Sequence, residues 1–255
     1  WRFELMPLPD EMASLDVPSR GAVFADLNGD AKLDLLLSTV GLGVRVFFNE
    51  GGFVFKDRTQ WAGTGSFSGS TSMALADVDG NGTLDLYVVN NRKNDIRDRA
   101  RVSVVRVGGQ ILPAEDLRDR LFIHDGQIHE FGEPDGLYLN DGDGRMSLVE
   151  WTSGVFREND QPLSGAPRDW GLSAMFRDFN GDRYPDLYVC NDYWTPDRIW
   201  INDGRGGFDA ATVDSLSVTS ASSMGVDGAD IDRDGDLDLL VVDMLSRDPI
   251  RRKTQ

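Results

Sequence analysis

The sequence has a single cysteine and only two histidines in 255 residues. One cysteine, Cys190, permits no internal disulfide, which excludes a small fold held together by disulfide bridges. No apolar run approaches the roughly 18 to 20 residues that a membrane-spanning helix needs. Basic residues are also scarce, because 26 Lys and Arg stand against 43 Asp and Glu and leave a formal net charge of −17. A surface of this sign excludes binding to nucleic acid through its phosphates and disfavours an anionic membrane.

Aspartate, in contrast, is abundant and recurs in one nine-residue pattern. Each copy has an acid or amide at positions 1, 3, 5 and 9, with small and apolar residues before it and an apolar β-rich run after it. The pattern therefore predicts a strand, an acidic loop and a second strand. The four copies, named loops 1 to 4 in chain order, are Asp26–Asp34, Asp77–Asp85, Asp178–Asp186 and Asp230–Asp238.

A second repeated element follows three of the four loops. Two runs of alternating apolar residues flank a turn rich in Asn, Asp and Gly, which predicts a β-hairpin because Gly and Asn tolerate positive φ. The hairpins are Val46–Phe55, Leu137–Met146 and Ile199–Phe208. Loop and hairpin together supply about four short strands per unit of about 50 residues, which is typical of a β-propeller blade. We therefore predict an all-β chain of about four such blades.

The second unit is longer than the others. Its hairpin Asn falls 63 residues after the loop start, against 23 in the first unit and 24 in the third. This spacing predicts an insertion of about 40 residues over 92–134; a degenerate extra unit is the alternative. Both histidines, His124 and His129, lie in it and bracket the turn of a plausible hairpin. We expect ordinary surface histidines, with a metal pair or an acid–base role as the alternative. Contact with a partner and simple cover for a blade edge are both open for the insertion.

The acidic loops predict sites for a hard cation. Ca²⁺ takes 6 to 8 oxygen ligands in an irregular cage, and oxygen side chains at alternate loop positions suit it. No loop contains Cys or His, so a soft metal is not expected. Position 12 holds Leu or Val where an EF-hand needs Glu, which excludes that motif. Metal-free turns are the alternative, but 14 Asp in four loops would repel one another and favour bound cations.

These loops resemble the cation-binding repeats of the FG-GAP/VCBS type, known from the integrin α-chain propeller and from many bacterial surface and secreted proteins. The stretches Phe48–Gly63 and Ala76–Asn90, and the ending Val242–Gln255, are similar to one branch, the family of cartilage acidic protein and its bacterial UnbV-type relatives. Members usually have about seven blades, which implies that this chain is part of a longer protein or larger assembly. The chain also begins at Trp1 without Met, so we expect a mature form or an excised piece.

The resemblance implies about four Ca²⁺ ions, with side-chain ligands at positions 1, 3, 5 and 9 and a main-chain carbonyl at position 7. Asn replaces an acid once in each of loops 1 to 3, which should weaken those sites relative to loop 4. The implied ligands are Asp26, Asn28, Asp30, Lys32 and Asp34; Asp77, Asp79, Asn81, Thr83 and Asp85; Asp178, Asn180, Asp182, Tyr184 and Asp186; and Asp230, Asp232, Asp234, Asp236 and Asp238.

No motif for catalysis is present, so we expect no catalytic residue. Tyr193 and Trp194 lie in an aromatic connection and are candidates for ligand contact, with packing between blades as the alternative. We expect a non-catalytic, calcium-binding module of an extracellular, cell-surface or periplasmic protein, where Ca²⁺ is abundant. Its partner would be a protein or a glycan, bound through the insertion over 92–134. The alternatives are a polysaccharide-active enzyme and an accessory subunit of a larger surface or periplasmic complex.

Overall fold

The computed structural model describes residues 12, 16–66, 68–94, 96, 102–193, 195–211, 220 and 222–244. Strands dominate this part of the chain, which also contains the four-residue helix α2 (Thr59–Ala62) and the 3-10 turn η2 (Glu115–Leu117). The all-β prediction is therefore confirmed. Within the described ranges, none of the helices has the length and apolar character that crossing a bilayer requires.

The first sheet contains four antiparallel strands in chain order. Loop 1 joins its first two strands, and a tight turn containing Gly51 and Gly52 joins its last two. Strands alternate inward and outward side chains, so Leu36 and Val46, which are paired across the sheet, are both fully buried. The strands are β1 (Ser19–Ala25), β2 (Asp34–Thr39), β3 (Gly43–Gly51) and β4 (Val54–Asp57).

The second sheet has the same order of strands but carries the insertion between its second and third strand. Leu137 of β11 pairs directly with Tyr87 of β6, so the residues between these strands leave the sheet and return to it. Loop 2 joins β5 to β6 in the way that loop 1 joins β1 to β2. The strands are β5 (Gly69–Ala76), β6 (Asp85–Asn91), β11 (Gly136–Asn140) and β12 (Met146–Leu148).

The third sheet has six strands, two more than the repeat predicts. The extra pair is β13 (Phe156–Glu158) and β14 (Gln161–Pro162), and β13 lies parallel to β18 with Phe156 opposite Phe208. Phe156 is fully buried and stacks on Phe208 at 5.3 Å between ring centroids, which fixes the extra strand to the sheet edge. The repeated strands are β15 (Gly171–Arg177), β16 (Asp186–Asn191), β17 (Arg198–Asn202) and β18 (Phe208–Ala210).

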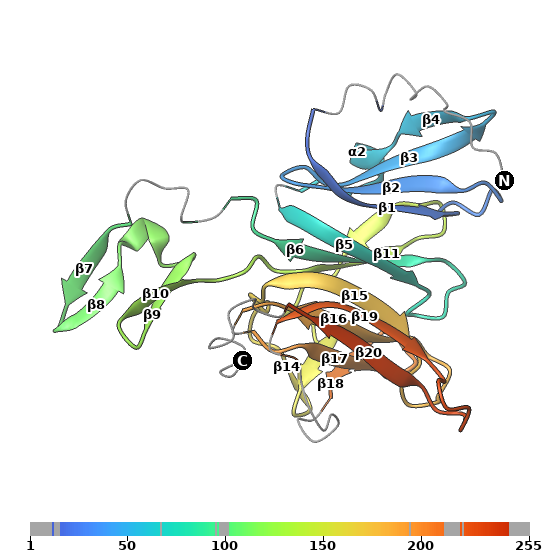
Figure 1. Ribbon diagram of the computed structural model, residues 1–255. Helices are drawn as coiled ribbons and strands as arrows, with labels where there is room; N and C mark the ends of the chain where they lie inside the picture. The colour runs from blue at the N-terminus through green and yellow to red at the C-terminus, as the bar shows by residue number, and fades with distance from the viewer. Residues whose placement is uncertain are drawn as a thin grey trace.

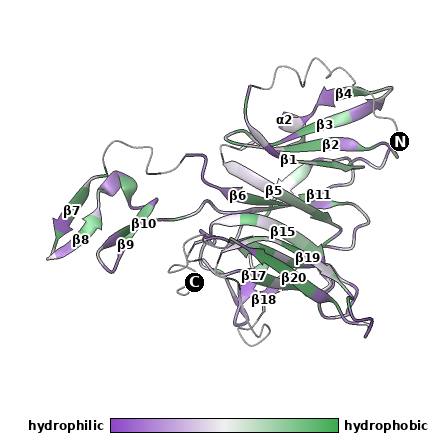
Figure 2. Cartoon of the chain, in the orientation of Figure 1, coloured by the Kyte–Doolittle hydropathy of each residue, from purple (hydrophilic) through white to green (hydrophobic). Residues whose placement is uncertain are grey.

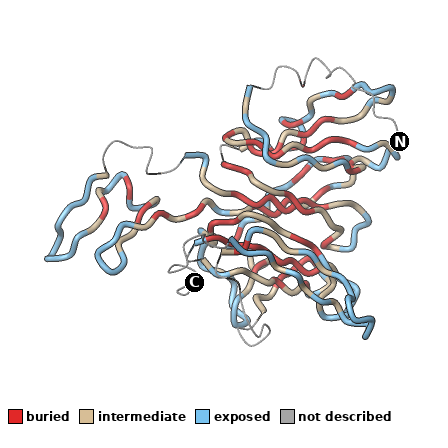
Figure 3. Tube along the Cα trace, in the orientation of Figure 1, coloured by how far each residue is buried: buried red, intermediate tan, exposed pale blue. Residues whose placement is uncertain are grey.

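The fourth unit is represented by two strands in the described residues, β19 (Ser223–Ala229) and β20 (Asp238–Asp243), which flank loop 4. The sheets are stacked in chain order, with β5 between β1 and β15 and with β19 against β15 (Figure 1). Apolar clusters fill the spaces between successive sheets, and the tube in Figure 3 is accordingly buried along the central strands. The described sheets follow one another as blades do but do not close into a ring, so a propeller remains a prediction.

The insertion projects from the side of this stack (Figure 1). Its described part forms two hairpins separated by η2 and no four-stranded sheet, which fits an insertion better than an extra repeat unit. The turn of the second hairpin is Asp125 and Gly126, both with positive φ, as the sequence pattern predicts. The hairpins are β7 (Val104–Val107) with β8 (Gln110–Pro113), and β9 (Leu121–His124) with β10 (Gln127–Glu130).

Candidate metal loops and the insertion arm

The four acidic loops share one pattern of hydrogen bonds, in which side-chain oxygens accept main-chain N–H groups further along the loop. In loop 1, Asp26 Oδ1 accepts from Gly29 at 2.8 Å, and Asp26 Oδ2 accepts from Ala31 at 2.9 Å. Asn28 Oδ1 accepts from Asp30 at 3.1 Å, and Asp30 Oδ1 accepts from Lys32 at 2.9 Å. Side chains at positions 1, 3 and 5 are thereby held inside the curl of the loop.

The curl depends on left-handed backbone at positions 4 and 6 of every loop. Both positions have positive φ in all four loops, and glycine holds only some of them. Position 6 is Ala31 in loop 1, with φ of 64°, and Arg183 in loop 3, with φ of 76°. A side chain with Cβ pays a conformational cost there that glycine does not. Position 4 of loop 4 is Arg233, with φ of 68°, so three of the four loops hold this curl with a residue that has Cβ.

The aspartate at position 9 joins its loop to the neighbouring hairpin. Asp85 is fully buried; its Oδ2 accepts the N–H of Val78 at 2.9 Å, and its Oδ1 accepts the N–H of Asn140 at 2.8 Å. Asp34 and Asp186 are buried in the same way and make the equivalent two bonds. Burial raises the pKa of Asp85 to about 6, and nearby Asp79 and Asp77 add to this while the two N–H groups oppose it.

The hairpin asparagine carries the connection to the next sheet. Asn140 Oδ1 accepts the N–H groups of Gly142 and Gly144, both at 3.0 Å, and so shapes the turn. Its Nδ2 donates to the carbonyl of Leu84 in its own sheet and, at 2.9 Å, to the carbonyl of Leu27 in loop 1 of the preceding sheet. Hydrogen bonds therefore connect the loops and hairpins of successive sheets at this end of the stack.

Loops 2 and 4 bring three carboxylates together. Single oxygens of Asp77, Asp79 and Asp85 all lie within 4.8 Å of one another, and the same holds for the triplet of loop 4 (Asp230, Asp232 and Asp238). The donors are all oxygens, which is the chemistry that Ca²⁺ selects, and a bound cation would offset the repulsion between the three carboxylates. The residues of these two loops therefore fit a calcium ion.

In loops 1 and 3, a side-chain nitrogen of the loop bonds to the carboxylate at position 5. Lys32 Nζ donates to Asp30 Oδ2 at 2.7 Å in loop 1, and Asn180 Nδ2 donates to Asp182 Oδ2 at 2.8 Å in loop 3. The Lys32 contact lowers the pKa of Asp30. Position 7 was expected to offer only its carbonyl, and the Lys32 side chain here adds an internal positive charge that competes with a cation.

The other predicted ligands lie on the same curls as their neighbours. Thr83 Oγ1 donates to Asn81 Oδ1 at 2.6 Å, which draws positions 5 and 7 of loop 2 together. Tyr184 and Asp236 hold position 7 of loops 3 and 4, and both donate their main-chain N–H to position 5 at 2.9 Å. Asp178 and Asp234 likewise take their expected places, since the N–H groups of Gly181 and Asp236 bond to them.

A second repeated contact lies at the ends of β6 and β16 that are remote from the acidic loops. Sequence analysis missed it. Tyr87 Oη donates to Asp135 Oδ2 at 2.9 Å, and Tyr188 Oη donates to Asp197 Oδ2 at 2.7 Å. The signal is visible in the sequence as Leu-Tyr-Val-x-Asn followed later by Pro-Asp. Its spacing also shows where the insertion belongs, because the few residues between Asn191 and Pro196 in the third sheet correspond to the whole insertion in the second.

The root of the insertion is anchored to the connecting segment that precedes β15. Trp170 Nε1 donates to the carbonyl of Glu130 at 2.9 Å, and the N–H of Gly132 donates to the carbonyl of Arg168 at 3.0 Å. The Arg168 guanidinium also lies 5.3 Å from the ring centre of Phe131. Glu130 is buried and pairs with Arg120 within the insertion. The root is therefore built as a fixed joint and not as a loose connection.

Beyond this joint, the arm formed by β7 to β10 exposes apolar side chains. Figure 2 shows hydrophobic residues along its strands, and Figure 3 shows that most of its outer part is exposed. Five of these residues have exposed fractions of 39 to 53 %: Val104, Val105, Val107, Ile111 and Ile128. His129 stacks on Phe122 at 5.2 Å and His124 is exposed near the turn, an arrangement that fits ordinary surface histidines.

Of the two candidate ligand-contact residues, Tyr193 lies beside the root of the arm. Its ring is 47 % exposed and meets Trp170 edge to face at 5.1 Å between centroids. Because Trp170 also bonds to Glu130, the Tyr193 connection and the insertion share one anchor. Trp194 lies outside the described residues.

The sequence profile of the FG-GAP-like repeat matches residues 26–88 and 178–241. The chain belongs to the FG-GAP-like repeat family. Each matched segment begins at the first residue of an acidic loop and contains two loops, so the family assignment rests on the same residues as the geometry above. The resemblance to FG-GAP repeats is thus confirmed, whereas the closer similarity to the cartilage acidic protein branch stays a prediction.

No curated protein sequence matches this FG-GAP-like repeat chain. Similar solved structures include a lectin from Agrocybe aegerita, described as recognising non-reducing terminal N-acetylglucosamine, at 19 % identity and a TM-score of 0.29 over 88 % of this chain. Another is the biofilm matrix protein Bap1 of V. cholerae, at 14 % identity and a TM-score of 0.22 over 84 % of this chain. The match covers 60 % of the lectin and 45 % of Bap1.

Proposed function

We propose that this FG-GAP-like repeat chain is a non-catalytic module that is stabilised by calcium and binds a partner outside the cytoplasm. The observation that carries the proposal is the convergence of Asp77, Asp79 and Asp85, whose carboxylate oxygens lie within 4.8 Å of one another. Three carboxylates at this separation disfavour the folded loop unless a cation offsets their charge. The matching triplet in loop 4 repeats the arrangement.

A calcium ion would supply positive charge at the point where each loop is tied to its sheet. Asp85 bonds both to the N–H of Val78 and to the N–H of Asn140, so it links loop 2 to the hairpin of the same sheet. Neutralising this carboxylate group would favour the packed arrangement of loop and hairpin. Loops of this kind bind calcium with modest affinity when their ligands include amides and carbonyls, and extracellular calcium is concentrated enough to fill them. We therefore place the module at the cell surface, in the periplasm or in the extracellular medium.

For the partner site, we propose the arm and the adjoining Tyr193 connection. The insertion over 92–134 has eight basic and eight acidic residues, so the whole net charge of −17 lies elsewhere in the chain. Its outer strands expose Val107 and Ile111 by 53 and 47 %. A neutral, apolar arm on a fixed joint suits contact with a protein or a glycan better than the strongly acidic body does.

A binding role has more support than the alternative of a polysaccharide-active enzyme. The sequence contains no motif for catalysis, whereas the arm exposes apolar side chains that suit a binding surface. The role of an accessory subunit is compatible with the arm as a docking element. The branch of cartilage acidic protein and its bacterial relatives remains our proposal for the nearest part of the family, on the stretch Phe48–Gly63.

The test is thermal unfolding in millimolar Ca²⁺ and in excess chelator, on the wild type and on the double variant Asp77→Asn, Asp79→Asn. We expect the chelator to lower the Tm of the wild type by several degrees and to lower that of the variant less. Asp143→Asn, which removes one negative charge from an exposed turn outside the loops, is the control and should behave as the wild type. A wild-type Tm that does not respond to chelator would contradict the proposal.

A further inference from the structure

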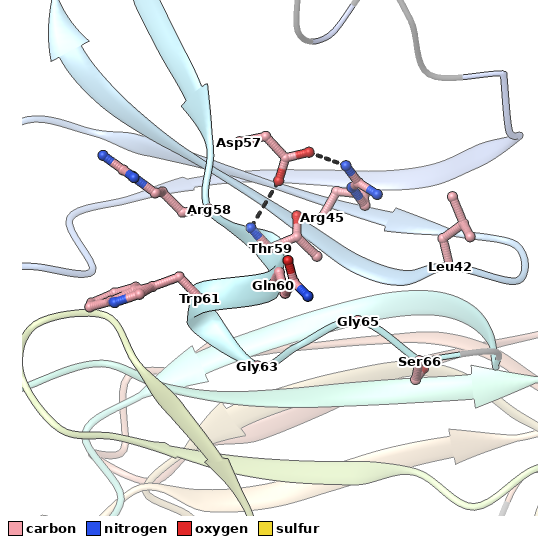
Figure 4. A pocket seen from close by; sticks show the side chains of 10 residues that line it. All are labelled: Leu42, Arg45, Asp57, Arg58, Thr59, Gln60, Trp61, Gly63, Gly65 and Ser66. Atoms are coloured by element: carbon pink, nitrogen blue, oxygen red, sulfur yellow. Dashed lines mark hydrogen bonds and ion pairs between the residues drawn. The ribbon is translucent and has the colours of Figure 1, made fainter.

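A cavity lies beside helix α2, next to the first sheet, and the proposed function does not use it. Its volume is about 680 Å³, within the range of cavities that hold small ligands. Figure 4 shows it between the end of β4, helix α2 and the chain that leads towards β5. The lining residues include Arg45, Asp57, Gln60 and Trp61. The cavity lies away from the insertion arm (Figure 1), so it is a separate candidate site.

Trp61 is the aromatic wall of this cavity. It is 41 % exposed although it is the largest side chain of α2, and it also lines a second hollow of about 280 Å³ together with Phe48 and Arg58. Phe48 meets its ring edge to face at 5.7 Å, and the Arg145 guanidinium lies 5.6 Å from its centre. The indole is therefore held in place by neighbours from two sheets while it remains open to solvent. An exposed aromatic ring that is already ordered can stack on a ligand at little entropic cost.

Planar polar groups form the back of the cavity. Asp57 accepts from the Arg45 guanidinium and, at 2.9 Å, from the N–H of Thr59 (Figure 4). The Arg45 Nε atom is buried and has no hydrogen-bond partner among the described residues. The Gln60 amide and the Ser66 hydroxyl add donors and acceptors at the rim. The polar side chains of Asp57, Gln60 and Ser66 that line the cavity can pair with polar atoms of a ligand.

From this arrangement we infer that the cavity binds a neutral sugar ring of a glycan. A pyranose has an apolar face that stacks on an indole and adjacent hydroxyls that both donate and accept, and Trp61 together with the Arg45–Asp57 pair offers the complement of each. Binding of a polyanionic sugar is disfavoured, because the protein has a net charge of −17. The Arg58 guanidinium, which lines the cavity, is also paired with Glu50 at 3.6 Å. The inference goes beyond the proposed function, because it adds a second binding site, for a glycan, apart from the partner site proposed at the arm.

The experiment is saturation-transfer NMR on the whole chain in calcium with five probes: glucose, galactose, mannose, N-acetylglucosamine and glucuronate. We expect at least one neutral sugar to bind, and Trp61→Ala to weaken that binding at least ten-fold. Trp61→Phe, which keeps a smaller ring, should give an intermediate affinity. Phe24→Ala is the matched control, because Phe24 is an exposed aromatic residue of β1 that does not line the cavity, and it should bind as the wild type does.

Several results would overturn the inference. Binding of glucuronate alone would show recognition by charge, and no binding of any probe would remove the site. Loss of binding in Tyr193→Ala but not in Trp61→Ala would move the sugar to the arm. Melting curves of each variant in calcium keep these outcomes separate from misfolding. The calcium response of the wild type tests the proposed function independently, because it depends on the acidic loops and not on Trp61.

Discussion

The side-chain amide of Asn202 donates to the main-chain carbonyl of Val78 at 2.9 Å, across 124 positions of the sequence. The bond runs from the hairpin of the third sheet to position 2 of loop 2 in the second sheet. Asn140 makes the same bond to Leu27, one sheet earlier. Val78 in turn donates its N–H to Asp85. Each of the first two acidic loops is therefore hydrogen-bonded to the sheet that follows it.

Replacing Asn202 should destabilise the fold strongly. The residue is 1 % exposed, and Asn202→Ala leaves the carbonyls of Val78 and Pro185 without their donor. Buried carbonyls that lose a partner cost about 1 to 3 kcal/mol, so we expect a loss of about 2 to 3 kcal/mol in urea unfolding. Asn49→Ala is the matched control, because its Nδ2 bonds only to Leu33 among the described residues. Equal losses in the two variants would argue against a role for the link between sheets.

Lys32 should weaken calcium binding by loop 1. Its ammonium lies 2.7 Å from Asp30 Oδ2, at a carboxylate that the resemblance assigns to the cation. Lys32→Thr, which copies position 7 of loop 2, removes the competing charge and should raise the calcium affinity of loop 1 by about five-fold. Isothermal titration calorimetry on the wild type and the variant measures the change. An unaltered affinity would mean that the side chain swings away without cost when calcium binds.

The strained residue at position 6 of loop 1 offers a stabilising substitution. Ala31 has φ of 64°, and glycine adopts this conformation without the penalty that Cβ imposes. Ala31→Gly is expected to stabilise the protein by about 0.5 kcal/mol, because relief of strain exceeds the added freedom of the unfolded chain. Urea unfolding in constant calcium measures this, with Ala22→Gly in β1 as a control that should destabilise. A destabilised Ala31→Gly variant would show that the loop does not hold this conformation in solution.

Asp135 should make stability depend on pH. Burial raises its pKa to about 7, Asp169 adds to this, and the N–H of Asn90, the Tyr87 hydroxyl and Arg198 oppose it. The unfolded carboxyl has a pKa of about 4, so the native state holds an extra proton between about pH 4 and 7. The stability contributed by the protonated form is complete below that window and is lost as pH rises through it.

The variant Asp135→Asn keeps a neutral group that can accept from Asn90 and bond to Tyr87. Between pH 5 and pH 7, the wild type should lose about 2 kcal/mol of its free energy of unfolding through Asp135. The variant should not show this loss. Urea unfolding at three pH values in excess chelator provides the comparison, since the chelator removes any change in calcium occupancy. Parallel pH profiles for the two proteins would contradict the assignment.

The parts of the fold that follow local turn chemistry could be read from the sequence. Asp and Gly at fixed offsets identify the loops, and the alternation around Asn140 and Asn202 identifies the hairpins, because these signals act within ten residues. The interval of 63 residues in the second unit likewise locates the insertion before β11. These predictions needed no knowledge of tertiary contacts.

Features that depend on distant residues could not be read in the same way. Strand β13 joins the third sheet because Phe156 packs on Phe208, which lies far along the chain and is not part of the repeat before it. The contact between Trp61 and Arg145, whose guanidinium lies 5.6 Å from the centre of the indole, likewise joins residues that are far apart in the sequence. Lys32 could have been recognised as a competing charge, since it is the only basic residue at position 7 of the four loops. The Tyr–Asp contacts were also visible as a repeat once the insertion was set aside.

The most direct test of the account is a count of bound calcium on the intact chain, by equilibrium dialysis and elemental mass spectrometry over a range of free Ca²⁺. The loops predict about four ions at saturation. The ions of loops 2 and 4, where the carboxylates already converge, should be retained to lower free calcium than those of loops 1 and 3. A chain that binds no calcium at millimolar concentration would show that the acidic loops are only turns, and the proposed calcium-stabilised module would be wrong.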